Sequence, residues 1–167
     1  MRQTNMRRGF TMIELIFVIV IIGILAAVAI PKLAATRDDA KISNIVSNTR
    51  TALGDMKSFY TSQGGTVWKD GNTTIGIVTD VALGTDCSAP TPDQGAANNE
   101  FVICDEVGGN ICITFTTDDD SVVVEATTST GTVCAGVLGD PAIQGIVGGD
   151  TAGDSKDHLL GGVGVQR

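Results

Sequence analysis

The sequence predicts an α+β protein, in which one long N-terminal spine helix, half of it transmembrane, packs against a small antiparallel sheet. Two observations predict this fold. An apolar run from Phe10 to Ile30 passes into an amphipathic stretch that ends at Gly64-Gly65, and glycine commonly stops helices. After residue 65, glycine, threonine, aspartate and valine dominate, and short runs rich in β-forming residues replace the helical pattern.

The helix is predicted to run from Phe10 to about Ser62. Residues 10–33 form a transmembrane and assembly segment, because about 20 apolar residues suffice to cross a membrane. Residues 34–65 form the amphipathic helix of a globular domain, with apolar side chains within an arc of about 100°. This stripe consists of Ile42, Ile45, Val46, Leu53, Met56 and Tyr60. We expect the C-terminal half of the chain to cover it.

An antiparallel β domain is expected at residues 66–135. Three consecutive strands are predicted, joined by turns at Gly108-Gly109-Asn110 and Asp118-Asp119-Asp120. The strands are Phe101–Cys104, Ile111–Thr116 and Val122–Thr127, and further β-rich runs occur at Thr73–Thr79 and Thr132–Val137. Residues 136–167 are rich in glycine and are expected to form a flexible or loosely packed tail.

The start of the apolar run carries one carboxylate, Glu14, and a basic leader of residues 1–9 precedes it. A charge buried in lipid costs roughly 2.5–3.5 kcal/mol on insertion scales. Something must therefore compensate the Glu14 carboxylate. A positive charge created nearby by processing of the chain is the favoured candidate.

The segment Gly9-Phe10-Thr11-Met12-Ile13-Glu14-Leu15 resembles the cleavage motif of type IV prepilins and type II secretion pseudopilins. The resemblance implies a pilin-like fold, cleavage by a prepilin peptidase between Gly9 and Phe10, and N-methylation of Phe10. Glu14 and Pro31 would then be residues 5 and 22 of the mature chain, as in the family. The resemblance also implies a homo-oligomeric helical fibre, in which Glu14 neutralises the N-terminal ammonium of a neighbouring subunit.

Two other readings of the N-terminus compete with this one. Ala27-Val28-Ala29 satisfies the small-residue rule of an ordinary secretory signal, which would release a periplasmic protein starting at Ile30. That reading leaves Glu14 unexplained. Arg7-Arg8 followed by Phe10 faintly resembles a twin-arginine export signal. The first residue of the mature protein separates the three.

The charge of the chain is segregated. The leader holds three of the eleven basic residues and no acidic residue. The mature chain therefore carries eight basic and nineteen acidic residues, a formal charge of −11. Such an acidic surface repels phosphate backbones, so nucleic acid is not expected as a direct partner. Basic residues before the apolar run place the leader in the cytoplasm. We therefore expect a single-pass inner-membrane protein whose C-terminal domain is periplasmic, before it enters a fibre in the periplasm or on the cell surface.

The four cysteines, Cys87, Cys104, Cys112 and Cys134, all lie in the part of the chain expected to be exported. An even number there favours two disulfides. Zinc is the alternative, but the spacings contain no Cys-x-x-Cys pair. Of the three connectivities, Cys104 with Cys112 across the turn at Gly108-Gly109 is preferred, which leaves Cys87 with Cys134.

Catalytic chemistry is not expected, because no catalytic motif or metal-ligating pair of histidines occurs. The single histidine, His158, is expected on the surface. Asp118, Asp119 and Asp120 are weak calcium candidates, since calcium takes several oxygen ligands. A solvated hairpin turn is the favoured reading of these aspartates, because adjacent strand residues point to opposite faces. No cofactor is expected beyond this weak calcium candidate.

These observations predict a non-catalytic structural subunit that assembles through its N-terminal helix. A type II secretion pseudopilin that supports protein secretion is favoured. A type IV pilus pilin, with roles in adhesion, motility or DNA uptake, is the alternative within this class. A membrane-anchored periplasmic binding module is the alternative outside it. The expected partners are other pilins or pseudopilins, the prepilin peptidase and the inner membrane.

Overall fold

The computed structural model describes residues 9–127 and 131–161. Of the leader predicted at residues 1–9, only Gly9 is described, and residues 162–167 of the predicted tail also lie outside the described residues. The chain divides into two compact units, Met1–Arg37 and Asp38–Arg167. The fold is α+β, with a long N-terminal helix and one antiparallel sheet, as the sequence predicts.

Helix α1 spans Met12–Gln63 and contributes to both units. Pro31 lies inside it without ending it, although proline removes one backbone hydrogen bond of the helix. The helix stops at the predicted glycines: Gly64 has φ 85° and donates its N–H to the carbonyl of Tyr60 at 2.9 Å. A left-handed backbone at this position costs glycine nothing, which is why it ends helices.

The second unit contains a four-stranded sheet in the order β1-β2-β3-β4, with every neighbouring pair antiparallel. The strands are β1 Glu100–Cys104, β2 Ile111–Thr117, β3 Ser121–Ala126 and β4 Ser155–Leu159. The register pairs Phe101 with Phe115 and Phe115 with Val124. Because residues directly opposite each other share a face, these side chains form one apolar surface.

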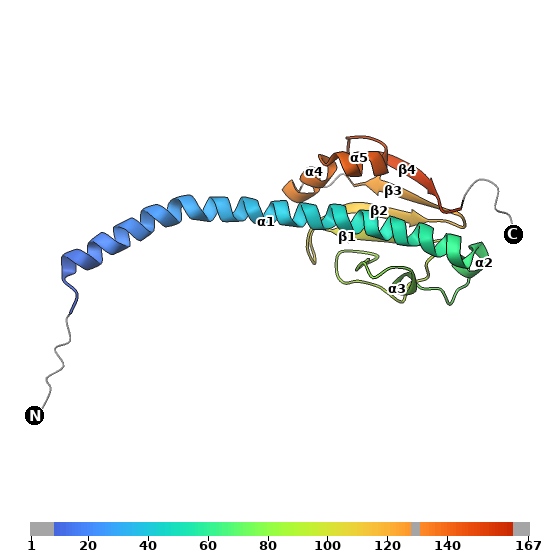
Figure 1. The fold of residues 1–167 in the computed structure, drawn as a ribbon, viewed down its shortest axis with the longest axis horizontal. Helices are drawn as coiled ribbons and strands as arrows, with labels where there is room; N and C mark the ends of the chain where they lie inside the picture. The colour runs from blue at the N-terminus through green and yellow to red at the C-terminus, as the bar shows by residue number, and fades with distance from the viewer. Residues whose placement is uncertain (1–8, 128–130, 162–167) are drawn as a thin grey trace, which may run out of the picture. The chain divides into compact units, whose positions relative to one another are not determined.

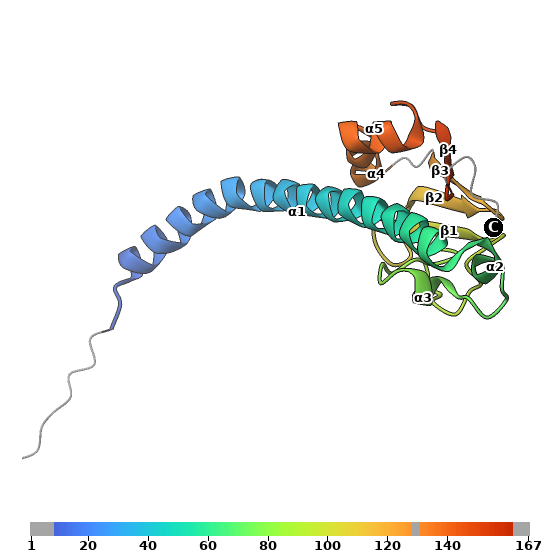
Figure 2. The ribbon, with the colours of Figure 1, turned by 45° about the vertical axis from the view of Figure 1, so that its right-hand side comes forward.

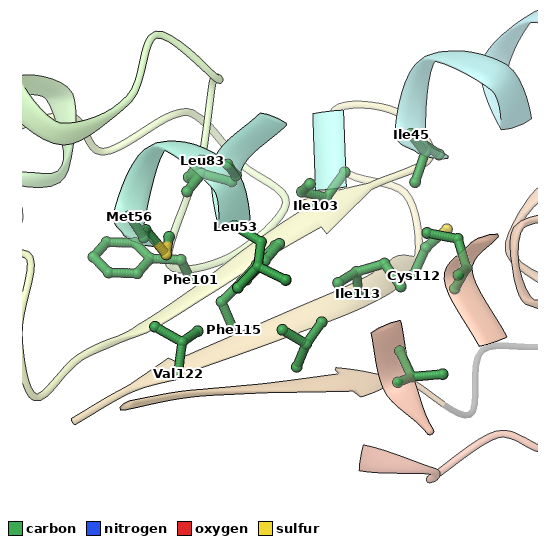
Figure 3. Close-up of a cluster of buried hydrophobic side chains, with 14 of the residues drawn as sticks. Ile45, Leu53, Met56, Leu83, Phe101, Ile103, Cys112, Ile113, Phe115 and Val122 are labelled. Atoms are coloured by element: carbon green, nitrogen blue, oxygen red, sulfur yellow. The ribbon is translucent and has the colours of Figure 1, made fainter. Parts of the chain in front are cut away.

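The α1 stripe covers that surface (Figure 3). Leu53, Met56 and Ile45 are buried against the sheet, whereas Ile42 and Tyr60 pack at the border of the core. The sheet contributes Phe101, Ile103, Ile113, Phe115, Val122 and Val124. The predicted stripe and its predicted partner surface are therefore confirmed.

Among the described residues, four short helices flank the sheet (Figures 1 and 2). They are α2 Gly65–Trp68, α3 Ile75–Val78, α4 Thr132–Leu138 and α5 Pro141–Val147. Helices α2 and α3 lie on the β1 side, and α4 and α5 lie on the β4 side. Trp68, fully buried, donates its indole N–H to the carbonyl of Asp118 at 2.9 Å, which joins α2 to the turn between β2 and β3.

Two predicted β-rich runs are helical. Thr73–Thr79 contains α3, in which Ile75 and Val78 are the buried residues. Thr132–Val137 lies within α4, in which Val133, Cys134 and Val137 are buried. Ile75 and Val78 are three residues apart, and Val133 and Val137 are four apart, which is the spacing of one helix face. The β-branched composition misled the prediction, because packing overrides propensity in short segments.

The prediction of a loose tail at residues 136–167 is wrong for its described part. Helix α5 buries Ile143 and Val147, Leu160 is also buried, and β4 pairs with β3. Asp140 caps α5 by accepting the N–H of Ala142 at 2.8 Å. Strand β4 escaped prediction because its sequence, Ser-Lys-Asp-His-Leu, is almost wholly polar. An edge strand tolerates such a sequence, since only one of its edges pairs.

Both expected disulfides form, but with a different connectivity. Cys87 bonds Cys104, and Cys112 bonds Cys134, so the preferred pairing of Cys104 with Cys112 is wrong. Cys104 ends β1 and Cys112 is the second residue of β2, but the register places Cys104 opposite Ile111. The register also shifts between Ile103 and Cys104, so Cys112 is not directly opposite Cys104. It lies instead against α4, where Cys134 is buried.

Candidate assembly site

The carboxylate of Glu14 is bound by the residue that precedes α1. Glu14 Oε2 accepts the backbone N–H of Thr11 at 2.8 Å and its hydroxyl, also at 2.8 Å. In return, Thr11 Oγ1 accepts the N–H of Glu14 at 3.3 Å. This reciprocal arrangement is a capping box, which satisfies donors that the first turn of a helix leaves without partners.

The capping box gives Glu14 a local structural role that sequence reasoning missed. The signal was present, because Thr-x-x-Glu before an apolar run is the sequence pattern of this cap. Both hydrogen bonds fall on Oε2. Within the described residues, Oε1 of Glu14 has no partner, so one carboxylate oxygen stays available to a donor from another molecule.

The segment of α1 that follows Glu14 is apolar on all sides and uncovered. Helix α1 is long and apolar enough to cross a membrane. Its large side chains in the first unit remain exposed, with Met12 at 78% and Leu25 at 64%. A helix that is apolar all round requires lipid or other helices as its surroundings. The first unit therefore carries the surface expected of an anchor and of a bundling helix.

Two predicted assembly residues do not form one site within a chain. Glu14 and Pro31 both lie in α1, and 17 residues of helix separate them by about 25 Å at 1.5 Å per residue. Gly9 and Phe10 precede the helix and are exposed. Exposure of this junction is what a processing enzyme requires, because a peptidase must reach the peptide bond.

The turn at Asp118-Asp119-Asp120 is closed by hydrogen bonds from neighbouring side chains. Asp119 accepts Lys69 Nζ at 3.0 Å on one oxygen and Asn98 Nδ2 at 3.1 Å on the other. These two hydrogen bonds, the one from Asn98 first, lower the pKa of the Asp119 carboxyl. Among the described residues, no group of three or more Asp, Glu, His or Cys side chains is arranged to hold a metal. The three aspartates lie in the turn between β2 and β3.

His158 is not the free surface residue that was expected. Its Nε2 lies 2.7 Å from the carbonyl of Ile146, and its Nδ1 lies 3.3 Å from Lys57 Nζ. A carbonyl only accepts, so Nε2 carries the hydrogen and Nδ1 accepts from Lys57. Burial lowers the pKa of His158, and the neighbouring Lys57 and Lys156 lower it further. His158 thus joins α5, β4 and α1 in its neutral form.

Comparison with known proteins supports the N-terminal motif. A family model described as the prokaryotic N-terminal methylation motif matches residues 4–30. The type IV major fimbrial protein of Dichelobacter nodosus is 32% identical over 116 residues, which cover 66% of this chain and 72% of that protein. No solved structure matches the chain.

Further relatives match over shorter lengths. The type IV major pilin protein of Neisseria gonorrhoeae is 32% identical over 81 residues, and the chain spans 47% of its length. The type II secretion system core protein G of Escherichia coli is 44% identical over 48 residues, and the chain spans 33% of its length.

The long apolar helix, the methylation motif at its start and the sheet packed on its second half define a fibre subunit with an N-terminal helical anchor. The chain belongs to the type IV pilin family. It is a structural subunit of a pilin-like fibre, and the relatives described above are named as a fimbrial protein, a pilin and a secretion system core protein.

Proposed function

We propose that this chain is a subunit of a type IV pilus, rather than the type II secretion pseudopilin that the sequence favoured. The lengths of the matches support this choice. The match to the Dichelobacter fimbrial protein, 116 residues, is longer than the 52 residues of α1 and so includes part of the globular unit. The match to the secretion protein, 48 residues, is shorter than α1.

Processing precedes assembly in this proposal. Residues 1–9 are the leader, and a prepilin peptidase cuts on the cytoplasmic side between Gly9 and Phe10. The methylation motif matched at residues 4–30 spans this junction. The cut leaves Phe10 with a free ammonium group, which the same enzyme family methylates. Residues 10–33 then hold the subunit in the inner membrane, with the C-terminal domain in the periplasm.

Assembly buries the apolar segment of α1 among the same segments of other copies. Leaving lipid for a helix bundle brings little hydrophobic gain, because lipid tails are as apolar as the side chains. Packing and charge neutralisation must therefore supply the preference. The uncovered side chains of the first unit provide the packing surface.

Charge neutralisation is assigned to Glu14 and to the Phe10 ammonium of a neighbouring subunit. The capping box uses Oε2 alone, so Oε1 can accept the neighbour's ammonium while the cap stays intact. A charge pair in a medium of low dielectric constant is far stronger than one in water. The cap orients the carboxylate, and the second oxygen makes the contact between subunits.

Two substitutions separate the cap from the charge. Glu14→Gln removes the charge, but glutamine can still form the capping box. Thr11→Val removes the hydroxyl of the cap and keeps the charge. We expect Glu14→Gln to be exported and cleaved normally but not to form fibres, and Thr11→Val to form them. Normal fibres from Glu14→Gln, scored by electron microscopy, would refute the role of the charge.

A deletion strain separates pilus from pseudopilus. We expect cells that lack this chain to lose surface fibres while their secreted enzymes still reach the medium. Restoring the wild-type gene should restore the fibres, and immunogold labelling should find the chain along their length. Retained fibres together with enzymes trapped in the periplasm would instead assign the chain to a secretion pseudopilus.

A further inference from the structure

The turn between α2 and α3 carries a sequence pattern that the fibre function does not use. Asn72-Thr73-Thr74 has the form Asn-x-Thr, in which an asparagine is an acceptor for N-linked glycans in exported proteins. No other asparagine of the chain has serine or threonine two residues further on. Asp70 stands two residues before Asn72, which extends the match to the Asp/Glu-x-Asn-x-Ser/Thr acceptor pattern of bacterial transferases.

The turn presents Asn72 to solvent. The N–H of Thr73 donates to the carbonyl of Asp70 at 2.8 Å, which closes the turn, and Thr73 is buried with its hydroxyl on the carbonyl of Val67 at 2.6 Å. Asn72, which lies between Asp70 and Thr73, is exposed. A Cβ built on Gly71 would meet no atom within 4 Å, so the outer side of the turn is open. Figure 1 shows this turn after the end of α1, at the surface of the second unit.

A transferase must reach the side-chain amide of Asn72 and the hydroxyl of Thr74. The amide is exposed, and the hydroxyl makes no hydrogen bond within the described residues. Asn72 Nδ2 donates to Asp70 Oδ1 at 3.2 Å, which uses one of its two hydrogens. Thr74 precedes α3 in the capping position, yet its side chain makes no capping hydrogen bond. Within the described residues the Thr74 hydroxyl has no hydrogen-bond partner, although the backbone of Thr74 bridges to Gly95.

We propose that Asn72 is a site of N-glycosylation, with a polyprenyl-diphosphate-linked oligosaccharide as the donor. Nδ2 of Asn72 forms a bond to C1 of the first sugar. The bond from C1 to the diphosphate oxygen breaks, its electron pair leaves with the polyprenyl diphosphate, and one amide proton passes to a base of the transferase. The site rests on the proposed function in one respect, since the globular unit must be exported to meet this donor.

Mass spectrometry of the peptide that contains Asn72 tests the proposal on full-length protein from its native cells. We expect this peptide to carry an added glycan mass, which Asn72→Gln and Thr74→Ala remove and Thr74→Ser retains. Asn48→Gln is the matched control, because Asn48 is also exposed but is followed by Thr49-Arg50. This variant should keep the glycan. The unmodified mass in wild-type protein, or a glycan that survives Asn72→Gln, would overturn the proposal.

The N-terminal peptide, measured in the same digest, distinguishes this failure from a failure of the proposed function. A chain that begins at Phe10 has been processed as a pilin whether or not it carries the glycan. A processed chain with an unmodified Asn72 would therefore refute glycosylation alone. A chain that keeps its leader would refute the processing step of the proposed function.

Discussion

Removing the Cys112–Cys134 disulfide should cost the domain several kcal/mol. The bond joins residues 22 apart, and the chain-entropy relation gives about 3.4 kcal/mol at 25 °C for a loop of that length. The Cys87–Cys104 bond, over 17 residues, gives about 3.1 kcal/mol by the same relation. The two costs should still differ, because Cys112 and Cys134 are 3% and 5% exposed and also lose core contacts on replacement.

Two double variants measure these costs, one with Cys112 and Cys134 replaced by alanine and one with Cys87 and Cys104 replaced. Urea unfolding of the detergent-solubilised chain can be followed by the fluorescence of Trp68, the single, fully buried tryptophan. With a slope of about 2 kcal/mol per M, a loss of about 3.4 kcal/mol lowers the midpoint by about 1.7 M. We expect the larger shift for the buried pair.

The connectivity itself is checked on the same variants. When Cys87 and Cys104 are replaced, a non-reduced peptide map should still contain the bond between Cys112 and Cys134. A wild-type map that links Cys104 to Cys112 would refute the reasoning. So would an unchanged urea midpoint after loss of the buried pair.

Other substitutions test the remaining contacts. Since burial lowers the folded pKa of His158 below its ordinary 6.5, the unfolded chain binds the proton first, and stability falls as the pH drops below about 6.5. Urea midpoints above and below that pH should differ less in His158→Gln than in wild type, and an equal difference would contradict this. Met56→Ala, at a fully buried position, should cost about 2–5 kcal/mol in urea unfolding, and an unchanged midpoint would disprove its core role. Gly148→Ala should cost about 1–2 kcal/mol because Gly148 has φ 90°. The control Gly145→Ala, inside α5 with open space around it, should gain up to about 1 kcal/mol, and similar effects of the two would contradict the backbone argument.

The elements that were predictable have local signals. Helix α1 combines an apolar run, a stripe at helical spacing and a glycine stop, and each is readable within a few residues. Strands β1, β2 and β3 lie within one or two residues of their predicted limits, because β-branched runs alternate with turn residues. The capping box at Thr11 and Glu14 has an equally local sequence pattern. It was missed because Glu14 was interpreted only as a charge that requires a partner.

The candidate site was predicted only in part, because some of its features depend on distant segments. The Thr11–Glu14 cap can be read from four residues of sequence, but the second carboxylate oxygen left open by the cap and the uncovered helix surface become visible only in the structure. The hydrogen bond between Lys57 and His158 joins residues 101 positions apart, and no pattern in either segment predicts it.

The amino-acid order alone determined the N-terminal motif, the long helix and the three-stranded meander, because each depends on periodicity or on turn chemistry between neighbours in the chain. The tertiary structure decided which cysteines pair and whether residues after 136 are ordered. Both outcomes depend on which faces meet. The register of β1 and β2 places Ile111, not Cys112, opposite Cys104, and Cys112 pairs with Cys134 of α4. A polar segment becomes β4 only because β3 offers a free edge.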